Sequence, residues 1–385
     1  MSTTERPSTP PSPAGTPVDQ AGAPATPDRR RVLLLGGLAV LLLVGGLWWA
    51  KYGPYSGKVP AVLGSHDLGA SVVTGGAEQA PPVSLAAGWD FTVAYTAAIW
   101  KALVVGLVLA AAVQVLLPAT WLRRVLGAPG ASPARGGLRG GLASVPTLMC
   151  SCCAAPLAVG LRRARAGTSA VLAFWLGNPA LNPVVLVFCL AVLPWPWAVL
   201  RFGAGLLVVV GAVALAGTLA RRRRPGALAE GPDAAGDASV DVPVDVPVDT
   251  RPLPVRFVAT LAGLSVRLVP EYLAVVFVLG VFRGVLFPAD TGAGVGAVAV
   301  LLLLVVAGIA LPVPTGGEVA VVAAALAAGL AAPAAAVLLV TLPVLSLPSL
   351  LMVRHVFGRG LLVGTTVLVA AVALLGAGLT AVLVG

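Results

Sequence analysis

Charged residues are scarce in this chain of 385 residues, at 10% of the total, and aromatic residues make up only 5%. A soluble domain carries roughly 25% charged residues, so this composition excludes a soluble globular fold. The mean hydropathy is +0.98. Long apolar runs with so few charges predict an all-α, polytopic membrane protein, because helices satisfy their own backbone hydrogen bonds in lipid.

Histidine and cysteine are also rare, with two and four residues respectively. These counts argue against a histidine-built metal cage and against a disulfide framework. The net charge is +10, but the arginines stand in short segments between apolar runs, as in the cytoplasmic loops of membrane proteins. We therefore predict no nucleic-acid partner. The chain lacks a Gly-x-x-x-x-Gly-Lys loop, which argues against ATP-driven pumping, and we predict neither a cofactor nor enzymatic activity.

The arginines orient the apolar runs across the membrane. Those at 29–31 and at 221–224 place the N-terminus and the end of the first half in the cytoplasm. Arginines also flank the run at 140–161 on both sides, which favours a hairpin that enters the membrane and returns. Whether this run and the broken run at 295–330 are re-entrant or fully spanning stays open at this stage.

The two halves of the chain are related by a shift of 164 residues. The shift places Pro179 on Pro343 and the segment 148–153 on 312–317. The loops of the second half that correspond to arginine-rich loops of the first lack Lys and Arg. This reversal predicts two repeats of inverted topology, each with a broken or re-entrant hairpin, after an extra N-terminal helix.

These features divide the chain into six parts. They are a disordered cytoplasmic tail (1–31), an N-terminal transmembrane helix (32–50), an extracytoplasmic loop (51–88), a first repeat (89–220), a low-complexity cytoplasmic linker (221–255) and a second repeat (256–385). In carriers with inverted repeats, the substrate site lies near mid-membrane where helices are broken. The interrupted segments are therefore the places to search for site residues.

Three of the four cysteines lie in the run Cys150-Ser151-Cys152-Cys153. Thiol sulfur is a soft ligand that suits Cu(I), Zn or trivalent arsenic. In an unwound segment two or three sulfurs can converge, so Cys150 and Cys152 are candidate metalloid ligands and Cys153 is a further candidate binding residue. The alternative is that these cysteines pack as small buried hydrophobes, which is the interpretation we give to Cys189.

A second interruption carries Asn178 and Asn182, each followed by a proline. Two prolines four residues apart free backbone carbonyls, and the amides can donate and accept hydrogen bonds. This combination predicts a coordinating or gating element. The alternative is a kinked helix whose amides bond to neighbouring helices.

The second half supplies the remaining candidates. Glu318 is an acid in an apolar run, where it faces a cavity or a partner, and it is a candidate proton carrier. The alternative is a loop carboxylate near the outer surface. Thr315 and Ser346 lie in the interrupted segments 312–318 and 341–348 and complete the predicted substrate-binding set.

Several of these motifs occur together in a known family. Cys-Ser-Cys at 150–152, then Gly167, Leu-Ala-Phe at 172–174 and Asn-Pro-x-x-Asn-Pro at 178–183 resemble the predicted permease family that includes organoarsenical efflux permeases. The Gly-Gly-Glu-Val and Leu-Pro-Ser-Leu-Leu of the second half resemble its second signature. The resemblance covers 90–220 and 257–384. It implies an inner-membrane permease with duplicated halves, with Cys150 and Cys152 implicated in export of trivalent organoarsenicals; Cys153 stands where the family often has glycine.

We therefore predict a multi-pass plasma-membrane permease with a cytoplasmic N-terminus. It moves a small solute, and efflux of a thiophilic metal or metalloid is the leading candidate. The predicted partners are this solute and the lipid bilayer. An intramembrane thiol redox protein and a non-transporting membrane scaffold remain as alternatives. The sequence leaves open the substrate, the direction, the coupling ion and whether the chain forms a homo-oligomer.

Overall fold

The computed structural model describes residues 29–69, 81–128, 132–222, 251–286 and 296–384. Within these ranges the chain forms helices and no strand. Seven of the described helices are long and apolar enough to cross a membrane, which confirms the prediction of an all-α, multi-pass membrane protein. The predicted tail up to residue 28 and the linker residues 223–250 lie outside the described residues.

The helices follow one another in a similar order in the two halves of the chain. Each half begins and ends with a long helix and holds two interrupted elements between them. The first half contains α3 (Leu85–Val115), α4 (Ala119–Leu126), α5 (Pro133–Ser144), the 3₁₀ turn η2 (Val145–Thr147), α6 (Ser151–Arg163), α7 (Thr168–Ala180), α8 (Pro183–Val192) and α9 (Trp195–Arg222). The second contains α10 (Leu253–Leu286), α11 (Ala297–Ala310), α12 (Gly317–Ala327), α13 (Ala332–Val344), α14 (Leu347–Val353) and α15 (Arg359–Val384).

The N-terminal helix is longer than the predicted 32–50. It consists of α1 (Arg29–Leu47), the π-helical turn η1 (Trp48–Tyr52) and α2 (Gly53–Ser65). Helix α2 therefore occupies the first part of the segment 51–88 that the sequence assigns to a loop. Its glycines and the internal Pro60 favour a loop in water, but such residues are tolerated in membrane helices when neighbouring helices surround them.

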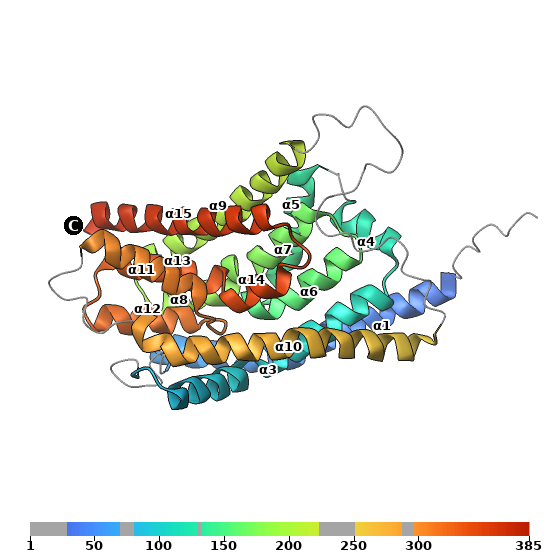
Figure 1. Ribbon diagram of the computed structural model, residues 1–385, viewed down its shortest axis with the longest axis horizontal. Coiled ribbons are helices and arrows are strands. Elements are labelled where there is room, and N and C mark those ends of the chain that lie inside the picture. Colours follow the sequence, from blue (N-terminus) through green and yellow to red (C-terminus); the bar gives the residue numbers. More distant parts are fainter. Residues whose placement is uncertain (1–28, 70–80, 129–131, 223–250, 287–295, 385) are drawn as a thin grey trace, which may run out of the picture.

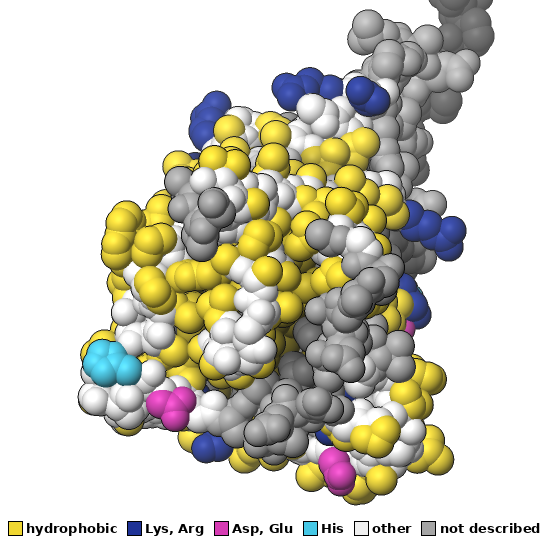
Figure 2. Space-filling view, turned by 90° about the vertical axis from the view of Figure 1, so that its left-hand side faces the viewer, with side chains coloured by type: hydrophobic (Ala, Val, Ile, Leu, Met, Phe, Trp, Pro, Cys, Tyr) yellow, Lys and Arg dark blue, Asp and Glu magenta, His cyan; other side chains and the backbone are white. Residues whose placement is uncertain are grey.

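The interrupted helices form the centre of the bundle. In the candidate spans Thr168–Val192 (α7–α8) and Ala332–Val353 (α13–α14), 72% and 83% of the most apolar window is buried. Helices α1, α3 and α10 run along one side of this centre, and α9 and α15 run along the other (Figure 1). Their outward side chains are apolar, with Val266 76% and Leu375 68% exposed, which suits contact with lipid. Hydrophobic side chains also cover much of the end of the molecule shown in Figure 2.

In the first half, α5 and α7 lie side by side and run in the same direction. Gly136 lies on Ala170 near the start of α7, and Gly177 near its end lies against Ser144. At Gly140 a Cβ atom would overlap the carbonyl oxygen of Ala170, so only glycine allows this approach. The chain turns at Leu148, which has a left-handed φ of 50°, and continues as α6.

Helix α6 runs in the direction opposite to α7. The carbonyl of Ser151, at the start of α6, accepts a hydrogen bond from Trp175 near the end of α7. After α6 ends, the N–H of Gly167, just before α7, donates to Gly127 at the end of α4. The turn between η2 and α6 therefore lies at the depth of the α7–α8 interruption.

In the second half, α11 and α12 both pack against α13. Gly308 near the end of α11 lies against the side chain of Thr341 in α13. The chain then passes through residues 311–316 and continues as α12, which packs against α13. Gly316 has a φ of 86°, a conformation that glycine adopts without strain. The connection between α11 and α12 thus lies beside the end of α13.

Candidate functional site

All four interrupted segments contribute to one small cavity, which has room for about one water molecule. The turn before α6 and the α7–α8 interruption provide its first-half walls. The α11–α12 connection and the end of α13 provide the others. The lining residues are Met149, Cys150, Pro179, Val185, Val313, Thr315, Glu318 and Pro343. Three of the predicted site residues, Cys150, Thr315 and Glu318, are therefore brought together in its wall.

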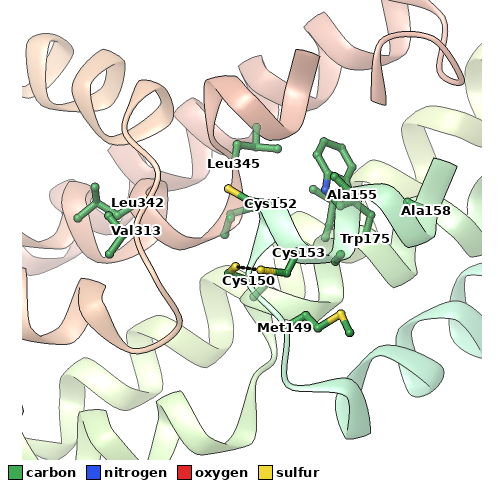
Figure 3. Close-up of a cluster of buried hydrophobic side chains, with 14 of the residues drawn as sticks. Met149, Cys150, Cys152, Cys153, Ala155, Ala158, Trp175, Val313, Leu342 and Leu345 are labelled. Carbon is green, nitrogen blue, oxygen red and sulfur yellow. Dashed lines mark hydrogen bonds between the residues drawn. The ribbon is translucent and has the colours of Figure 1, made fainter. Parts of the chain in front are cut away.

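The thiols of Cys150 and Cys153 form a close pair, with their sulfur atoms 3.0 Å apart (Figure 3). Cys150 is the N-cap residue of α6, and Cys153 lies three residues further on the same face. All four cysteines are free and buried. Cys150 and Cys153 have the Cys-x-x-Cys spacing at the start of a helix, so an interpretation of the sequence as lacking this motif is wrong.

Cys152, the second predicted metalloid ligand, has different neighbours. Its sulfur lies 3.1 Å from the hydroxyl oxygen of Ser346 and 3.7 Å from that of Tyr95. Among the described residues, no three His, Cys, Asp or Glu side chains form a cluster that could hold a metal ion. The arrangement thus provides a two-thiol site, and Cys152 belongs to the contact with the helix that Ser346 begins.

Ser346 connects the two halves of the chain. Its hydroxyl caps α14 by accepting from the N–H of Ser349 at 3.4 Å. The same hydroxyl also lies 3.4 Å from that of Ser151. The start of α6 in the first half therefore packs directly on the start of α14 in the second.

Asn178 holds the turn before α6 in place. Its side-chain oxygen accepts hydrogen bonds from the Thr147 hydroxyl and from the N–H of Met149, the latter at 3.2 Å. Its amide nitrogen donates to the carbonyl of Phe174 at 2.9 Å. Neither Asn178 nor Asn182 is among the residues that line the cavity. We infer that Asn178 positions Cys150 rather than contacting a ligand.

Asn182 caps α8. Its side-chain oxygen accepts from the N–H groups of Val184 at 3.1 Å and Val185 at 3.4 Å. Its amide nitrogen is buried and has no hydrogen-bond partner among the described residues. Asn178 therefore bonds to the turn before α6 through its side-chain oxygen, and Asn182 caps α8.

Glu318 lies at the start of α12 and is only 2% exposed. Its carboxylate pairs with the guanidinium of Arg201 at 3.4 Å. Arg201, in α9, is 1% exposed and donates to the carbonyls of Pro179 at 2.5 Å and Ala180 at 3.1 Å. The guanidinium thus satisfies the carbonyls that the interruption frees and binds an acid of the other half.

Lys51 reaches the cavity wall from the N-terminal helix. Its ammonium donates to the hydroxyl of Thr315 at 3.0 Å, and the side chain is 7% exposed. Next to it, the hydroxyl of Tyr52 donates to the carbonyl of Pro146 in η2 at 2.7 Å. The N-terminal helix therefore contacts the connections of both halves.

Sequence reasoning missed Lys51 and Arg201. Both are buried cations within long apolar helical segments, and such residues usually mark a functional or structural partner. Arg201 stands near the start of a predicted span, where it reads as an interfacial residue. Lys51 directly follows the predicted end of the first span at residue 50, so it was assigned to the loop.

Comparison with known proteins gives a consistent picture. The model of a family described as a predicted permease matches residues 84–382. The Escherichia coli K12 protein named UPF0718 protein YraQ is 38% identical over 327 residues, which cover 83% of this chain and 87% of that protein. No solved structure gives a significant match. The helix that carries Lys51 precedes the residues that the family model matches.

Proposed function

This chain belongs to the predicted permease family, and we propose that it carries a small solute across the plasma membrane through the cavity between its four interrupted segments. One observation carries this proposal: residues from all four interruptions line the same cavity. Carriers bind their solutes at broken helices near mid-membrane, and the two most buried candidate spans here are the broken ones.

We infer that the two halves are repeats of inverted topology, each with a re-entrant hairpin. The long helices of one half pack on their counterparts in the other, α3 on α10 and α9 on α15. The start of α6 packs on α14, and α12 packs on α8, which is the exchange that a two-fold relation requires. The opposite directions of α6 and α7 support a hairpin that returns to the side where α5 begins.

The membrane orientation follows from the charges. The arginines after α3, after α6 and after α9 would all face the cytoplasm if the N-terminus is cytoplasmic. We therefore propose this orientation, with both re-entrant hairpins meeting at the middle of the membrane.

The thiol pair supports a thiophilic solute, with trivalent organoarsenicals as the leading candidates. Thiols are soft ligands, and the two sulfurs of Cys150 and Cys153 are close enough to bind one arsenic atom. Two As–S bonds would replace two As–O bonds, and each thiol proton would leave with a hydroxyl group as water. Exchange of the same bonds with other thiols would release the solute, which suits efflux.

Substitution of the thiol pair tests this proposal. In an arsenic-sensitive host, we expect the Cys150→Ser/Cys153→Ser variant to lose resistance to a trivalent phenylarsenical. Inside-out vesicles from the same cells should lose uptake of that compound. Cys189→Ser is the matched control, since Cys189 is an equally buried thiol away from the cavity lining. Retained flux in the double variant would show that the thiols do not bind the solute.

A second candidate function is intramembrane thiol redox chemistry. One observation favours it, namely the Cys-x-x-Cys spacing of Cys150 and Cys153 at the start of α6 with a 3.0 Å sulfur–sulfur distance. A dithiol in this position can exchange with another disulfide through a mixed disulfide. Replacing Cys153 by Ser would then trap a partner on Cys150, visible as a mass shift on a non-reducing gel. Vesicle flux that depends on the pair, without such a trapped species, would exclude this candidate.

A further inference from the structure

The ammonium of Lys51 is a positive charge in the centre of an apolar protein. Its side chain is 7% exposed, and it lies on the long apolar helix Leu34–Ser65. An isolated charge at membrane depth is unfavourable, so buried cations pair with anions or face a water-filled path. The identity of the anion that faces Lys51 therefore matters for function.

The described residues supply Lys51 with no carboxylate partner. Its hydrogen bond goes to the neutral hydroxyl of Thr315. The acid nearest to this point in the cavity wall is Glu318, and Glu318 pairs with Arg201. The ring of Tyr55, whose centroid is 5.7 Å away, attracts the cation but does not neutralise it.

The cavity next to Lys51 is where an anion would enter, and it must widen beyond its room for about one water molecule to admit one. Thr315, which accepts from Lys51, lines the cavity together with Cys150 and Glu318. An anionic group on a bound solute would replace the Thr315 hydroxyl as the partner of the ammonium, or would share the ammonium with it. The charge of Glu318 would not repel this group strongly, because Arg201 neutralises it.

We propose that Lys51 binds an anionic group, such as a carboxylate, on the transported solute. This inference rests on the proposed transport site and names the chemical class of its substrate: a small anion, whose thiophilic centre would bind at Cys150 and Cys153. It also gives the N-terminal helix a role in recognition. That helix precedes the residues that the family model matches.

Three probes separate the two parts of this site. Phenylarsenous acid carries the arsenic alone, benzoate carries the carboxylate alone, and 4-carboxyphenylarsenous acid carries both. Their dissociation constants are measured by calorimetry on the full chain purified in detergent. The variants are Lys51→Met, which keeps the length and removes the charge, and Lys51→Arg, which keeps the charge. Lys58→Met is the control, since Lys58 is an exposed cation on the same helix.

For the wild type we expect the carboxylated arsenical to bind at least about ten-fold more tightly than the uncharged one, the equivalent of one added ion pair. Lys51→Met should reduce this ratio to about one without changing the affinity for phenylarsenous acid. Lys51→Arg and Lys58→Met should keep the ratio. The affinity for phenylarsenous acid is measured on the same samples. A misfolded variant would therefore be recognised because it binds neither phenylarsenous acid nor 4-carboxyphenylarsenous acid.

Other results would overturn the anion site at Lys51, the thiol site at Cys150 and Cys153, or both sites. A ratio near one in the wild type, or an unchanged ratio in Lys51→Met, overturns the role of Lys51 and leaves the proposed thiol site intact. If neither arsenical binds the wild type, the thiol site fails, and benzoate decides the rest. Benzoate binding that Lys51→Met abolishes would support the anion site alone, and absence of benzoate binding would overturn it.

Discussion

The two halves of this chain use a similar order of helices but place different chemistry where they contact each other. At the start of α6, a thiol of the first half meets a hydroxyl of the second, Cys152 against Ser346. At the start of α12, an acid of the second half meets a guanidinium of the first, Glu318 against Arg201. One contact between the halves is neutral and soft, and the other is charged.

This difference implies that the two contacts between the halves differ in how much they stabilise the protein. Thiol–hydroxyl contacts are weak, and the α6–α14 contact of Cys152 with Ser346 lies outside the cavity lining. A buried ion pair is strongly destabilising when one partner is removed, so the α12–α8 side suits the permanent connection of the halves. The comparison predicts that single substitutions will affect stability more on the second side than on the first.

Replacement of Arg201 should have the largest effect. Arg201→Met leaves Glu318 as an unpaired buried charge and removes the donor to two backbone carbonyls, which should cost about 3–5 kcal/mol of stability. Thermal unfolding in detergent and the monodisperse fraction on size exclusion would measure this. Arg201→Met/Glu318→Leu should recover part of the loss. If Arg201→Met unfolded at the same temperature as the wild type, the charged contact would not hold the halves together.

The second-largest effect is expected at glycines in close helix contacts, and it should differ between Gly140 of the first half and Gly308 of the second. Gly140→Ala places a Cβ on the backbone oxygen of Ala170, which cannot rotate away, so we expect a loss of about 2–3 kcal/mol from overpacking. Gly141→Ala is the control, because nothing lies within 4 Å of its added Cβ. Gly308→Ala meets the hydroxyl of Thr341, which can rotate, and its Cβ, which cannot, so we expect it to unfold at a temperature below that of Gly141→Ala. Equal unfolding temperatures of Gly140→Ala and Gly141→Ala would contradict the packing of α5 on α7.

Substitution of Asn178 tests whether a side-chain hydrogen bond stabilises the turn before α6 in the first half, with no counterpart in the second half. Asn178→Ala leaves the buried N–H of Met149 without an acceptor, at a cost of about 1–2 kcal/mol. The shift of 164 residues places the apolar Leu342 at the corresponding position of the second half. Leu342→Ala should leave the affinity for a trivalent phenylarsenical unchanged, whereas Asn178→Ala should weaken it by displacing Cys150. If both Asn178→Ala and Leu342→Ala lost affinity for the phenylarsenical, the loss would not be specific to the hydrogen bond of Asn178.

The smallest effect is expected at the two helix caps. Ser346 caps α14 and Asn182 caps α8, and loss of such a cap typically costs about 1 kcal/mol. Ser346→Ala and Asn182→Ala should therefore lower the unfolding temperature by similar amounts, while Ser346→Thr keeps the hydroxyl and stays near the wild type. A much larger effect of Ser346→Ala would show that its contact with Cys152 contributes stability beyond capping.

Local sequence was sufficient to locate the interruptions of the helices. Proline removes helix hydrogen bonds wherever it stands inside a helix, so the prolines of 178–183 and 312–317 indicated breaks that the structure contains. Polar residues such as Glu318 could be assigned to the interior because an acid is costly in lipid. Both arguments depend only on neighbours along the chain.

Contacts between distant segments could not be predicted in this way. The contact of Cys152 with Ser346 depends on which helix of the second half lies beside the start of α6. The roles of Arg201 and Lys51 depend on which helices lie beside them. Their bonds to Glu318 and Thr315 join residues 117 and 264 positions apart, a separation that no local pattern reports.

The π-helical turn at Trp48–Tyr52 has a consequence for how the N-terminal helix faces its surroundings. Before the turn, one face of α1 points outward, with Leu41 70% and Val44 60% exposed, and the other is buried, as at Leu47, 6% exposed. An α-helix advances about 100° per residue, so one additional residue in a wide turn rotates everything that follows by that angle. Lys51 lies within this turn and faces the protein. Two chains with almost identical hydropathy profiles can therefore differ in whether a cation of this helix is exposed or buried in the protein.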